Sequence, residues 1–288
     1  MSVVAYVNGR YHIHSRASVH IEDRGFQFSD GVYEVIAVRN GRPVDETLHM
    51  DRLDYSLGQI RLPWPVAPTA FRVILREVAN RNRIRAFGLL YVQVTRGSAP
   101  RNHAFPTVTK ATLVVTGRPL RFAGTEDLRK GVAVITAPDL RWKRCDIKAI
   151  SLLPNVLAKQ AAIEAGAYET WMVDEHGLIT EGSASNAWIV SEAGDLVTRH
   201  ADWAILNGIT RRVIVERALD LGLRFVERPF AVAEVSSARE AFLTSTTSLV
   251  KPVVKIDGQT VGEGGIGALT ESLLQFYQSH MDQTDTFN

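Results

Sequence analysis

The chain has almost no cysteine and no long apolar run. Cys145 is the one cysteine among 288 residues, which excludes an internal disulfide. No Cys/His spacing typical of a zinc site occurs, so no metal is expected. The first residues lack the basic segment and apolar core of a signal peptide, and no stretch is long enough to cross a bilayer. We therefore expect a cytoplasmic protein that spans no membrane.

A strong net charge is also lacking. The chain has 33 Lys and Arg against 31 Asp and Glu, a formal net charge of +2. Proteins that bind nucleic acid usually present a strongly basic face, so nucleic acid is not expected as a partner. The local basic clusters, Arg141–Arg144 and Arg211-Arg212, fit a small anion better. The length suffices for two modest domains, each with its own core.

Hydrophobic periodicity and turn residues predict a mixture of strands and helices. Strands are expected at 3–7, 32–38, 89–95, 111–116, 132–136, 169–173, 187–190 and 241–244. Helices are expected at 49–60, 69–81, 155–165 (capped by Asn155) and from 209 to 221. Glycine and proline interrupt both patterns near residue 119. The domains expected are a small N-terminal α+β domain over 1–118, a linker over 119–124, a larger C-terminal domain over 125–280 and a disordered tail over 281–288.

Lys148 stands alone among apolar residues in the segment from Arg141 to Asn155. Apolar neighbours and the preceding basic residues both disfavour the charged ammonium, and a neutral amine can form a Schiff base with an aldehyde or ketone. The alternative is an ordinary lysine whose stem packs on apolar residues while its amine reaches water. The segment by itself leaves both interpretations open.

Three further segments offer ligands for an anion. Gly208-Ile209-Thr210 precedes a helix, so its N–H groups and a hydroxyl would face the anion at the positive helix end; a simple helix cap is the alternative. Ser245-Thr246-Thr247-Ser248 supplies four hydroxyls after a strand, where an ordinary turn uses one or two. Arg52 offers a positive charge, although most such arginines are merely solvated.

Glu181 lies at the end of a predicted strand. A carboxylate there could hold a proton on a pyridine nitrogen, which an enzyme of pyridoxal 5'-phosphate needs for its electron sink. A surface glutamate in a turn is the alternative. Taken together, Lys148, Glu181 and the anion segments are the ligands expected for that one cofactor.

Five segments occur in the order found in the fold-type IV pyridoxal-phosphate enzymes, which the chain resembles from about Tyr6 to Phe276. They are Asp23–Glu34, the Lys148 segment, Glu181–Asn186, Asn207–Arg211 and Ser245–Ser248. The family includes D-amino acid aminotransferases, branched-chain aminotransferases, aminodeoxychorismate lyases and (R)-selective amine transaminases. The resemblance implies a two-domain fold of the α+β and α/β type, with the cofactor in the interdomain cleft, and a homodimer.

By this resemblance, Lys148 would form the Schiff base with pyridoxal phosphate and shuttle the substrate proton, and Glu181 would pair with the pyridinium. The residues expected to hold the phosphate are Arg52, Ile209, Thr210, Ser245 and Thr246. Ser183 and Ser185 would lie near the ring.

The loop from Arg96 to Pro106 is the most informative segment for the substrate. Arg101 and His103 lie on the same side of an extended segment and together suit a carboxylate, although a basic surface loop is the alternative. In D-amino acid aminotransferases an R-x-H pair here reaches in from the neighbouring subunit and joins a tyrosine on the substrate α-carboxylate. The substrate-binding set expected by resemblance is Tyr33, Tyr91, Arg101, His103 and Thr247.

We therefore predict transamination between D-alanine and 2-oxoglutarate, giving pyruvate and D-glutamate. Leu249 stands where many relatives have glutamate, and Ala37 where some D-amino acid aminotransferases have lysine, so a specificity that extends to (R)-amines stays open. A branched-chain aminotransferase, an (R)-amine transaminase and an aminodeoxychorismate lyase are the alternatives within the fold. A basic binding protein that uses the two arginine clusters is the alternative outside it.

Overall fold

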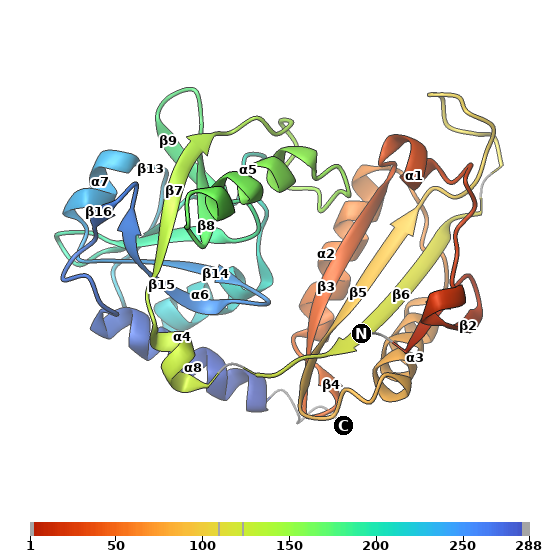
Figure 1. Ribbon diagram of the computed structural model, residues 1–288, viewed down its shortest axis with the longest axis horizontal. Helices are drawn as coiled ribbons and strands as arrows, with labels where there is room; N and C mark the ends of the chain where they lie inside the picture. The colour runs from red at the N-terminus through yellow and green to blue at the C-terminus, as the bar shows by residue number, and fades with distance from the viewer. Residues whose placement is uncertain (1–2, 109, 123, 284–288) are drawn as a thin grey trace. The chain divides into compact units, whose positions relative to one another are not determined.

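The computed structural model describes residues 3–108, 110–122 and 124–283, and the chain forms two compact units (Figure 1). Unit 1 comprises Met1–Phe122, Ile147–Ser151 and the end of the chain from Met281; unit 2 comprises Ala123–Asp146 and Leu152–His280. The first boundary falls inside the expected linker over 119–124. Ile147–Ser151 belongs to unit 1, whereas the sequence predicts it in the C-terminal domain.

Unit 1 is built on a six-stranded antiparallel sheet with the strand order β2-β1-β6-β5-β3-β4. The strands are β1 (Val4–Val7), β2 (Arg10–Ile13), β3 (Gly31–Arg39), β4 (Arg42–Pro43), β5 (Phe87–Thr95) and β6 (Thr112–Pro119). Asn8-Gly9 and Asn40-Gly41 form the predicted hairpin turns, with positive φ at all four residues. Such turns match the twist of the strands they join.

Helices cover one face of this sheet. They are α2 (Glu46–Gln59) and α3 (Pro68–Arg81), and the unit also has the short α1 (Arg24–Phe28) and the 3₁₀ helix η1 (His14–Arg16). Side chains alternate between the faces of a strand, so Val32, Glu34 and Ile36 of β3 all point into this buried layer. Tyr33 points to the opposite face. The alternation thus separates a charged residue in the core from an aromatic residue outside it.

The segment Ile147–Ser151 lies along β3. The Tyr33 amide donates to the Lys148 carbonyl at 3.0 Å, and the Ile150 amide donates to the Gly31 carbonyl at 3.1 Å. A Cβ at Gly31 would lie 3.1 Å from the Ile150 side chain and closer still to the backbone of β5, so the absence of a side chain permits the approach. The residues on either side of Lys148 are buried in the core of unit 1. Hydrogen bonding and apolar burial therefore fix Lys148 to this sheet.

Unit 2 is built on a ten-stranded mixed sheet, with the order β12-β11-β10-β14-β15-β7-β8-β9-β13 and β16 paired to β15. The strands are β7 (Val132–Pro138), β8 (Glu169–Val173), β9 (Leu178–Gly182), β10 (Asn186–Val190), β11 (Leu196–Thr198), β12 (Phe225–Glu227), β13 (Phe230–Ala231), β14 (Glu240–Ser245), β15 (Leu249–Ile256) and β16 (Gln259–Thr260). The pairs β7/β8, β7/β15 and β11/β12 are parallel. Trp171, Trp188, Phe230 and Phe242 are fully buried and fill the core.

The helices of unit 2 are α4 (Thr125–Arg129), α5 (Leu153–Glu164), α6 (Ile209–Asp220), α7 (Val232–Ser237) and α8 (Ala268–Gln283). Of these, α4, α7 and α8 are not predicted from the sequence, and α5 begins two residues earlier than predicted. Leu152 is the N-cap of α5, because proline at 154 suits the first turn, and Asn155 donates instead to the Ser183 carbonyl at 2.8 Å. α8 makes residues 281–283 helical where disorder was expected; residues 284–288 lie outside the described part. No helix within the described ranges is long and apolar enough to cross a membrane.

Candidate active site

Lys148 faces two tyrosines of the unit 1 sheet. Its Nζ lies 4.3 Å from the ring centroid of Tyr33, and the rings of Tyr33 and Tyr91 are 5.8 Å apart. Tyr33 on β3 is paired with Gln93 on β5, two residues from Tyr91, so both tyrosines occupy the same face. A cation above an aromatic face is attracted to the ring. The structure therefore brings together three of the predicted residues, Lys148, Tyr33 and Tyr91.

Tyr91 is a neutral hydrogen-bonding group at physiological pH. Burial raises the pKa of its hydroxyl to about 12, and nearby Tyr33 adds to the effect. The hydroxyl donates to Gln93 Oε1 at 2.7 Å. Gln93 was not singled out from the sequence, although its position two residues after Tyr91 in a strand places both on one face.

Arg52 is buried in an ion pair with Glu34. Arg52 Nε and Nη2 donate to the two Glu34 carboxylate oxygens, each at 2.7 Å, and His49 Nδ1 donates to Oε2 at 2.7 Å. Burial by itself raises the pKa of Glu34, but the charge of Arg52 and the hydrogen bonds from Arg52 and His49 hold it well below its usual value. Burial lowers the pKa of His49, so its imidazole is neutral at pH 7. The guanidinium is thus fixed by its carboxylate partner.

Glu34 and His49 were missed by the sequence analysis. One signal was present: Glu34 occupies a core-facing position of β3, where an unpaired charge is costly. His49 precedes Arg52 by three residues and shares its helix face. A buried acid in a strand, followed by His and Arg on one face of the next helix, predicts such a cluster.

Acid should destabilise the protein through Glu34 and Asp139. Arg52 lowers the pKa of Glu34, and Arg141 lowers the pKa of Asp139. Burial acts in the opposite direction on both carboxyl groups but does not outweigh the arginines. A folded-state pKa below the unfolded one gives stability that is complete above the unfolded pKa, about 4, and is lost as the pH falls. We expect the melting temperature to drop between about pH 5 and about pH 3. Thermal unfolding across this range, with Asp139→Asn expected to flatten the dependence, checks it; a melting temperature that does not fall with pH contradicts it.

Glu181 is fully buried and surrounded by donors. Arg141 Nη1 donates to its Oε1, Asn186 Nδ2 donates to Oε2 at 2.9 Å, and the Leu206 amide reaches both oxygens at 3.1 and 3.2 Å. Burial raises the pKa of Glu181, and Arg141 and the Leu206 amide offset part of the effect. Asp139 holds Arg141 in turn, with Arg141 Nη2 at 2.7 Å from its Oδ2. These contacts orient the carboxyl group that was predicted to face a pyridine nitrogen.

Ser183 and Ser185 are directed at a second buried acid, Glu169 of β8. The Ser183 hydroxyl donates to Glu169 Oε1, and the Ser185 hydroxyl donates to Oε2 at 3.3 Å. The Thr170 amide donates to Oε1 at 2.9 Å, and the Ala184 amide donates to Oε2 at 3.3 Å. Glu169 was not singled out from the sequence, and the placement of the two serines near a cofactor ring stays a prediction.

The start of α6 suits an anion. Gly208 is the N-cap, and no side chain caps the helix. A Cβ at Gly208 would lie 2.1 Å from Asn186 Oδ1, so a side chain there would clash. Ile209 and Thr210 form the first turn, and the Thr210 hydroxyl donates to Tyr277 Oη at 3.1 Å. An uncapped helix N-terminus with its amide dipoles is a favourable place for phosphate.

The hydroxyls of Ser245–Ser248 are partly used by the turn itself. The Ser248 amide donates to Ser245 Oγ at 3.0 Å, and Ser245 Oγ lies 3.3 Å from Thr247 Oγ1. Thr246 is half-buried and Thr247 is exposed. Leu249, the residue that departs from the family pattern, closes the turn with φ +55°. An L-residue rarely adopts this conformation, so the turn is held by its surroundings.

Arg101 and His103 gather at one aromatic ring. Arg101 Cζ lies 4.6 Å from the ring centroid of Phe28, and the His103 ring centroid lies 5.2 Å from it. Both side chains are exposed. The structure thus places the predicted carboxylate pair together on a common surface of unit 1.

Three of the five basic residues in the two clusters, Arg141, Arg144 and Arg211, pair with acids, whereas the sequence favours a small anion as their partner. Arg141 pairs with Asp139 and Glu181, and Arg144 pairs with Asp146 at 2.9 Å. Arg211 is buried and pairs with Glu227. These acids lie two to 40 residues away in sequence, so a run of basic letters alone does not predict free charge.

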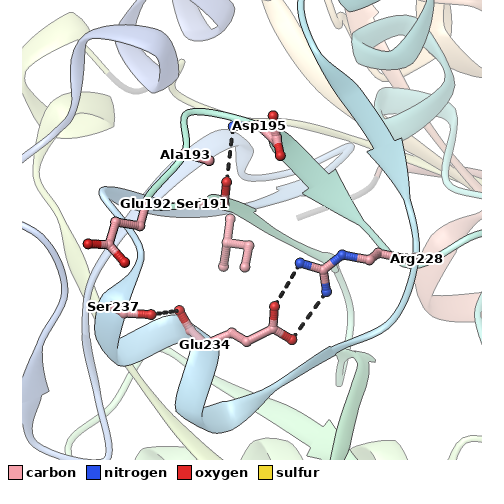
Figure 2. Close-up of a pocket in the computed structure, with 8 residues that line it drawn as sticks. Ser191, Glu192, Ala193, Asp195, Arg228, Glu234 and Ser237 are labelled. Atoms are coloured by element: carbon pink, nitrogen blue, oxygen red, sulfur yellow. Dashed lines mark hydrogen bonds and ion pairs between the residues drawn. The ribbon is translucent and has the colours of Figure 1, made fainter.

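A pocket of unit 2 with a volume of about 490 Å³ contains none of the predicted residues (Figure 2). It lies at the carboxyl end of β10, where Ser191 follows, whereas Asn186, the partner of Glu181, begins that strand. Two of the charged groups that line it pair with each other, since Arg228 Nη2 donates to Glu234 Oε2 at 2.7 Å, and Ser237 Oγ donates to the Glu234 carbonyl. Glu192 and Asp195 also line the pocket. Nothing in this chemistry points to a ligand.

The predicted residues fit pyridoxal phosphate in their chemistry. Unit 1 supplies an amine beside an aromatic face and a buried guanidinium; unit 2 supplies a buried carboxyl group and an uncapped helix with a hydroxyl. Among the described residues, no three His, Cys, Asp or Glu side chains group as a metal site would require.

Residues 31–256 match the class IV aminotransferase family. The chain belongs to the class IV aminotransferases. Two relatives of this class IV aminotransferase are D-alanine aminotransferases. That of Bacillus licheniformis is 41% identical over 271 residues, 92% of this chain and 93% of the relative. That of Staphylococcus haemolyticus is 36% identical over 278 residues, 96% and 97% of the two chains.

Solved structures agree on the fold of this class IV aminotransferase. The branched-chain amino acid aminotransferase of Escherichia coli superposes with a TM-score of 0.88 at 23% identity, over 100% of this chain and 98% of the other. The 4-amino-4-deoxychorismate lyase of Pseudomonas aeruginosa superposes with a TM-score of 0.83 at 26% identity, over 96% and 99%. The predicted fold-type IV fold is confirmed.

Proposed function

We propose that this class IV aminotransferase uses pyridoxal 5'-phosphate to move the amino group of D-alanine to 2-oxoglutarate, giving pyruvate and D-glutamate. The observation that carries the proposal is that Arg101 and His103 both lie against the ring of Phe28. An arginine fork with a neighbouring imidazole suits the two oxygens of a carboxylate. Relatives of 36 to 41% identity named D-alanine aminotransferase support it.

When bound, pyridoxal phosphate would accept the electron pair that remains on the substrate Cα after its proton is removed. Lys148 would hold the cofactor through Nζ, and its amine would serve as the base and acid that moves the substrate Cα proton. Tyr33, whose ring faces Nζ at 4.3 Å, keeps the amine in place. Glu181 holds a proton on the ring nitrogen, and Arg141 orients Glu181.

The phosphate of the cofactor is assigned to one guanidinium group and to the backbone amides and hydroxyl groups of two turns. These residues are Arg52, Ile209, Thr210, Ser245 and Thr246. Glu34 fixes the Arg52 guanidinium, and α6 contributes its uncapped first turn. A phosphate gains both from charge and from backbone N–H donors.

The protein is proposed to act as a homodimer in which Arg101 and His103 serve the neighbouring subunit's site. Their exposure in unit 1 supports this assignment. Tyr33 and Tyr91 line the substrate side, with Thr247 from the β14–β15 turn. The cytoplasmic location expected from the sequence stays a prediction.

The visible absorption spectrum of the purified protein tests the proposal. We expect the band of the protein-bound cofactor to disappear on adding D-alanine and to change much more slowly with L-leucine. Bleaching by L-leucine first would assign a branched-chain aminotransferase, and bleaching by (R)-1-phenylethylamine alone an amine transaminase. No band after addition of pyridoxal phosphate would contradict the cofactor assignment.

Arg101→Ala should raise the KM for D-alanine by roughly 10- to 100-fold, the usual effect of losing a hydrogen bond to a charged group. The rate with (R)-1-phenylethylamine, which has no carboxylate, should change little. Steady-state kinetics with both donors measures this, and Arg85→Ala, which removes an exposed arginine outside the loop, serves as the control. Equal losses with both donors would remove the carboxylate role of Arg101.

A further inference from the structure

The loop from Arg96 to Pro106 is anchored by a buried cluster of Arg24, Asp30 and Arg96. Arg24 Nε donates to Asp30 Oδ2 at 2.7 Å, and Arg96 donates through Nε to Oδ2 at 2.8 Å and through Nη2 to Oδ1 at 3.0 Å. Both arginines are only 3% exposed, which is rare for this residue type. One carboxylate therefore holds two buried guanidinium groups.

Arg24 uses its remaining N–H groups on the backbone of the loop. Nη1 donates to the carbonyls of Asn102 and Ala104, and Nη2 donates to the carbonyl of His103 at 3.3 Å. The Arg24 amide donates to the Gly97 carbonyl at 2.9 Å. Three successive carbonyls directly after Arg101 are thus held by one planar group.

Arg96 fixes the far end of the same loop. Its Cζ lies 3.6 Å from the ring centroid of Phe105, and its Nη2 donates to the Ile60 carbonyl at 2.7 Å. Arg96 also begins the loop, so its start and its end are tied to one side chain. Arg101 and His103 lie between these attachments, and their own side chains stay exposed.

We propose that Arg24 is a positioning residue for recognition of the substrate α-carboxylate. It holds the backbone of residues 102–104 so that Arg101 and His103 are set for a carboxylate before substrate arrives, and Asp30 keeps Arg24 in place. Ordering an exposed loop on binding costs about 1–2 kcal/mol per residue, and a pre-ordered loop avoids that cost. The inference rests on the proposed function of Arg101 and His103.

Arg24→Lys is the first test. Lysine keeps the charge beside Asp30, but one ammonium group cannot reproduce a planar fork on three carbonyls. We expect the KM for D-alanine to rise roughly 10- to 100-fold, as for a misplaced binding group, with kcat within about threefold of wild type. Arg16→Lys, at an exposed site of η1, is the matched control. A wild-type KM in Arg24→Lys would overturn the proposal.

A double-mutant cycle separates positioning from general damage. If Arg24 acts through Arg101, Arg24→Lys should cost little once Arg101 is alanine, so the two losses in kcat/KM should not add. Additive losses would assign Arg24 a purely structural role. If Arg101→Ala by itself leaves the KM for D-alanine unchanged, the proposed carboxylate role of Arg101 is wrong. That outcome is distinct from a failure of the positioning role of Arg24, which would leave the effect of Arg101→Ala intact.

Discussion

A Lys148→Ala variant is expected to lose multiple turnover completely. Lys148 is the residue assigned both to hold the cofactor and to move the substrate proton. The methyl group of alanine can do neither. The Lys148 backbone is also fixed along β3 by hydrogen bonds, and its amine lies beside the ring of Tyr33. General acid–base catalysis alone is typically worth about 10²- to 10⁴-fold. The loss should exceed this because the covalent attachment is removed as well.

Steady-state transamination with D-alanine and 2-oxoglutarate measures the effect. Lys143→Ala, an exposed lysine five residues earlier, is the matched control and should keep its activity. Reduction with borohydride followed by mass spectrometry should mark the wild-type peptide that contains Lys148 and leave the variant unmarked. Undiminished turnover in Lys148→Ala, or a label on another lysine, would contradict the assignment.

A Glu34→Ala variant is expected to lose about 3–5 kcal/mol of unfolding free energy, the usual cost of leaving a buried charge without its partner. Glu34 is 1% exposed and receives two hydrogen bonds from Arg52 and one from His49. Its removal leaves a guanidinium in the core of unit 1. The cofactor should also dissociate more readily, since Arg52 loses the group that fixes it.

Urea unfolding of the wild type and the variant gives the difference in free energy. Glu77→Ala, which removes the exposed i,i+4 pair with Arg81, is the control and should cost about 0.3–0.5 kcal/mol. A double variant, Glu34→Leu with Arg52→Met, should recover much of the stability because no unpaired charge remains. It should still bind pyridoxal phosphate weakly. A Glu34→Ala protein as stable as the Glu77→Ala control would show that the pair is not the support described.

Local signals in the sequence predicted much of the fold. The Asn8-Gly9 turn could be predicted because both residues readily adopt the positive φ values of the turn. Helix α3 could be predicted from the helical spacing of apolar residues such as Phe71 and Leu75. The predicted start of α5 is wrong because Asn155 competes with a proline one residue earlier. Helix α8 and strand β15 were not predicted at all. The α5 error concerns a boundary where two local preferences compete.

The candidate site was less accessible, because its residues are organised by partners far away in sequence. Lys148 was found from its apolar neighbours, and these do pack in a core. Arg141 was grouped with other cations, but its partner Glu181 is 40 residues away. The role of Arg24 in holding the loop depends on residues 78 to 80 positions later. The spacing of residues along the sequence does not predict contacts between side chains so far apart.

The path of the chain around Lys148 limits how the protein can be divided. The segment Ile147–Ser151 belongs to unit 1, while the residues before and after it belong to unit 2. A single cut near residue 122 would therefore yield an N-terminal fragment without the peptide that lines β3, and a C-terminal fragment carrying that peptide without its sheet. Neither half would be self-contained. Lys148 follows the first residues of unit 2 in the sequence, but its peptide is part of the folded structure of unit 1.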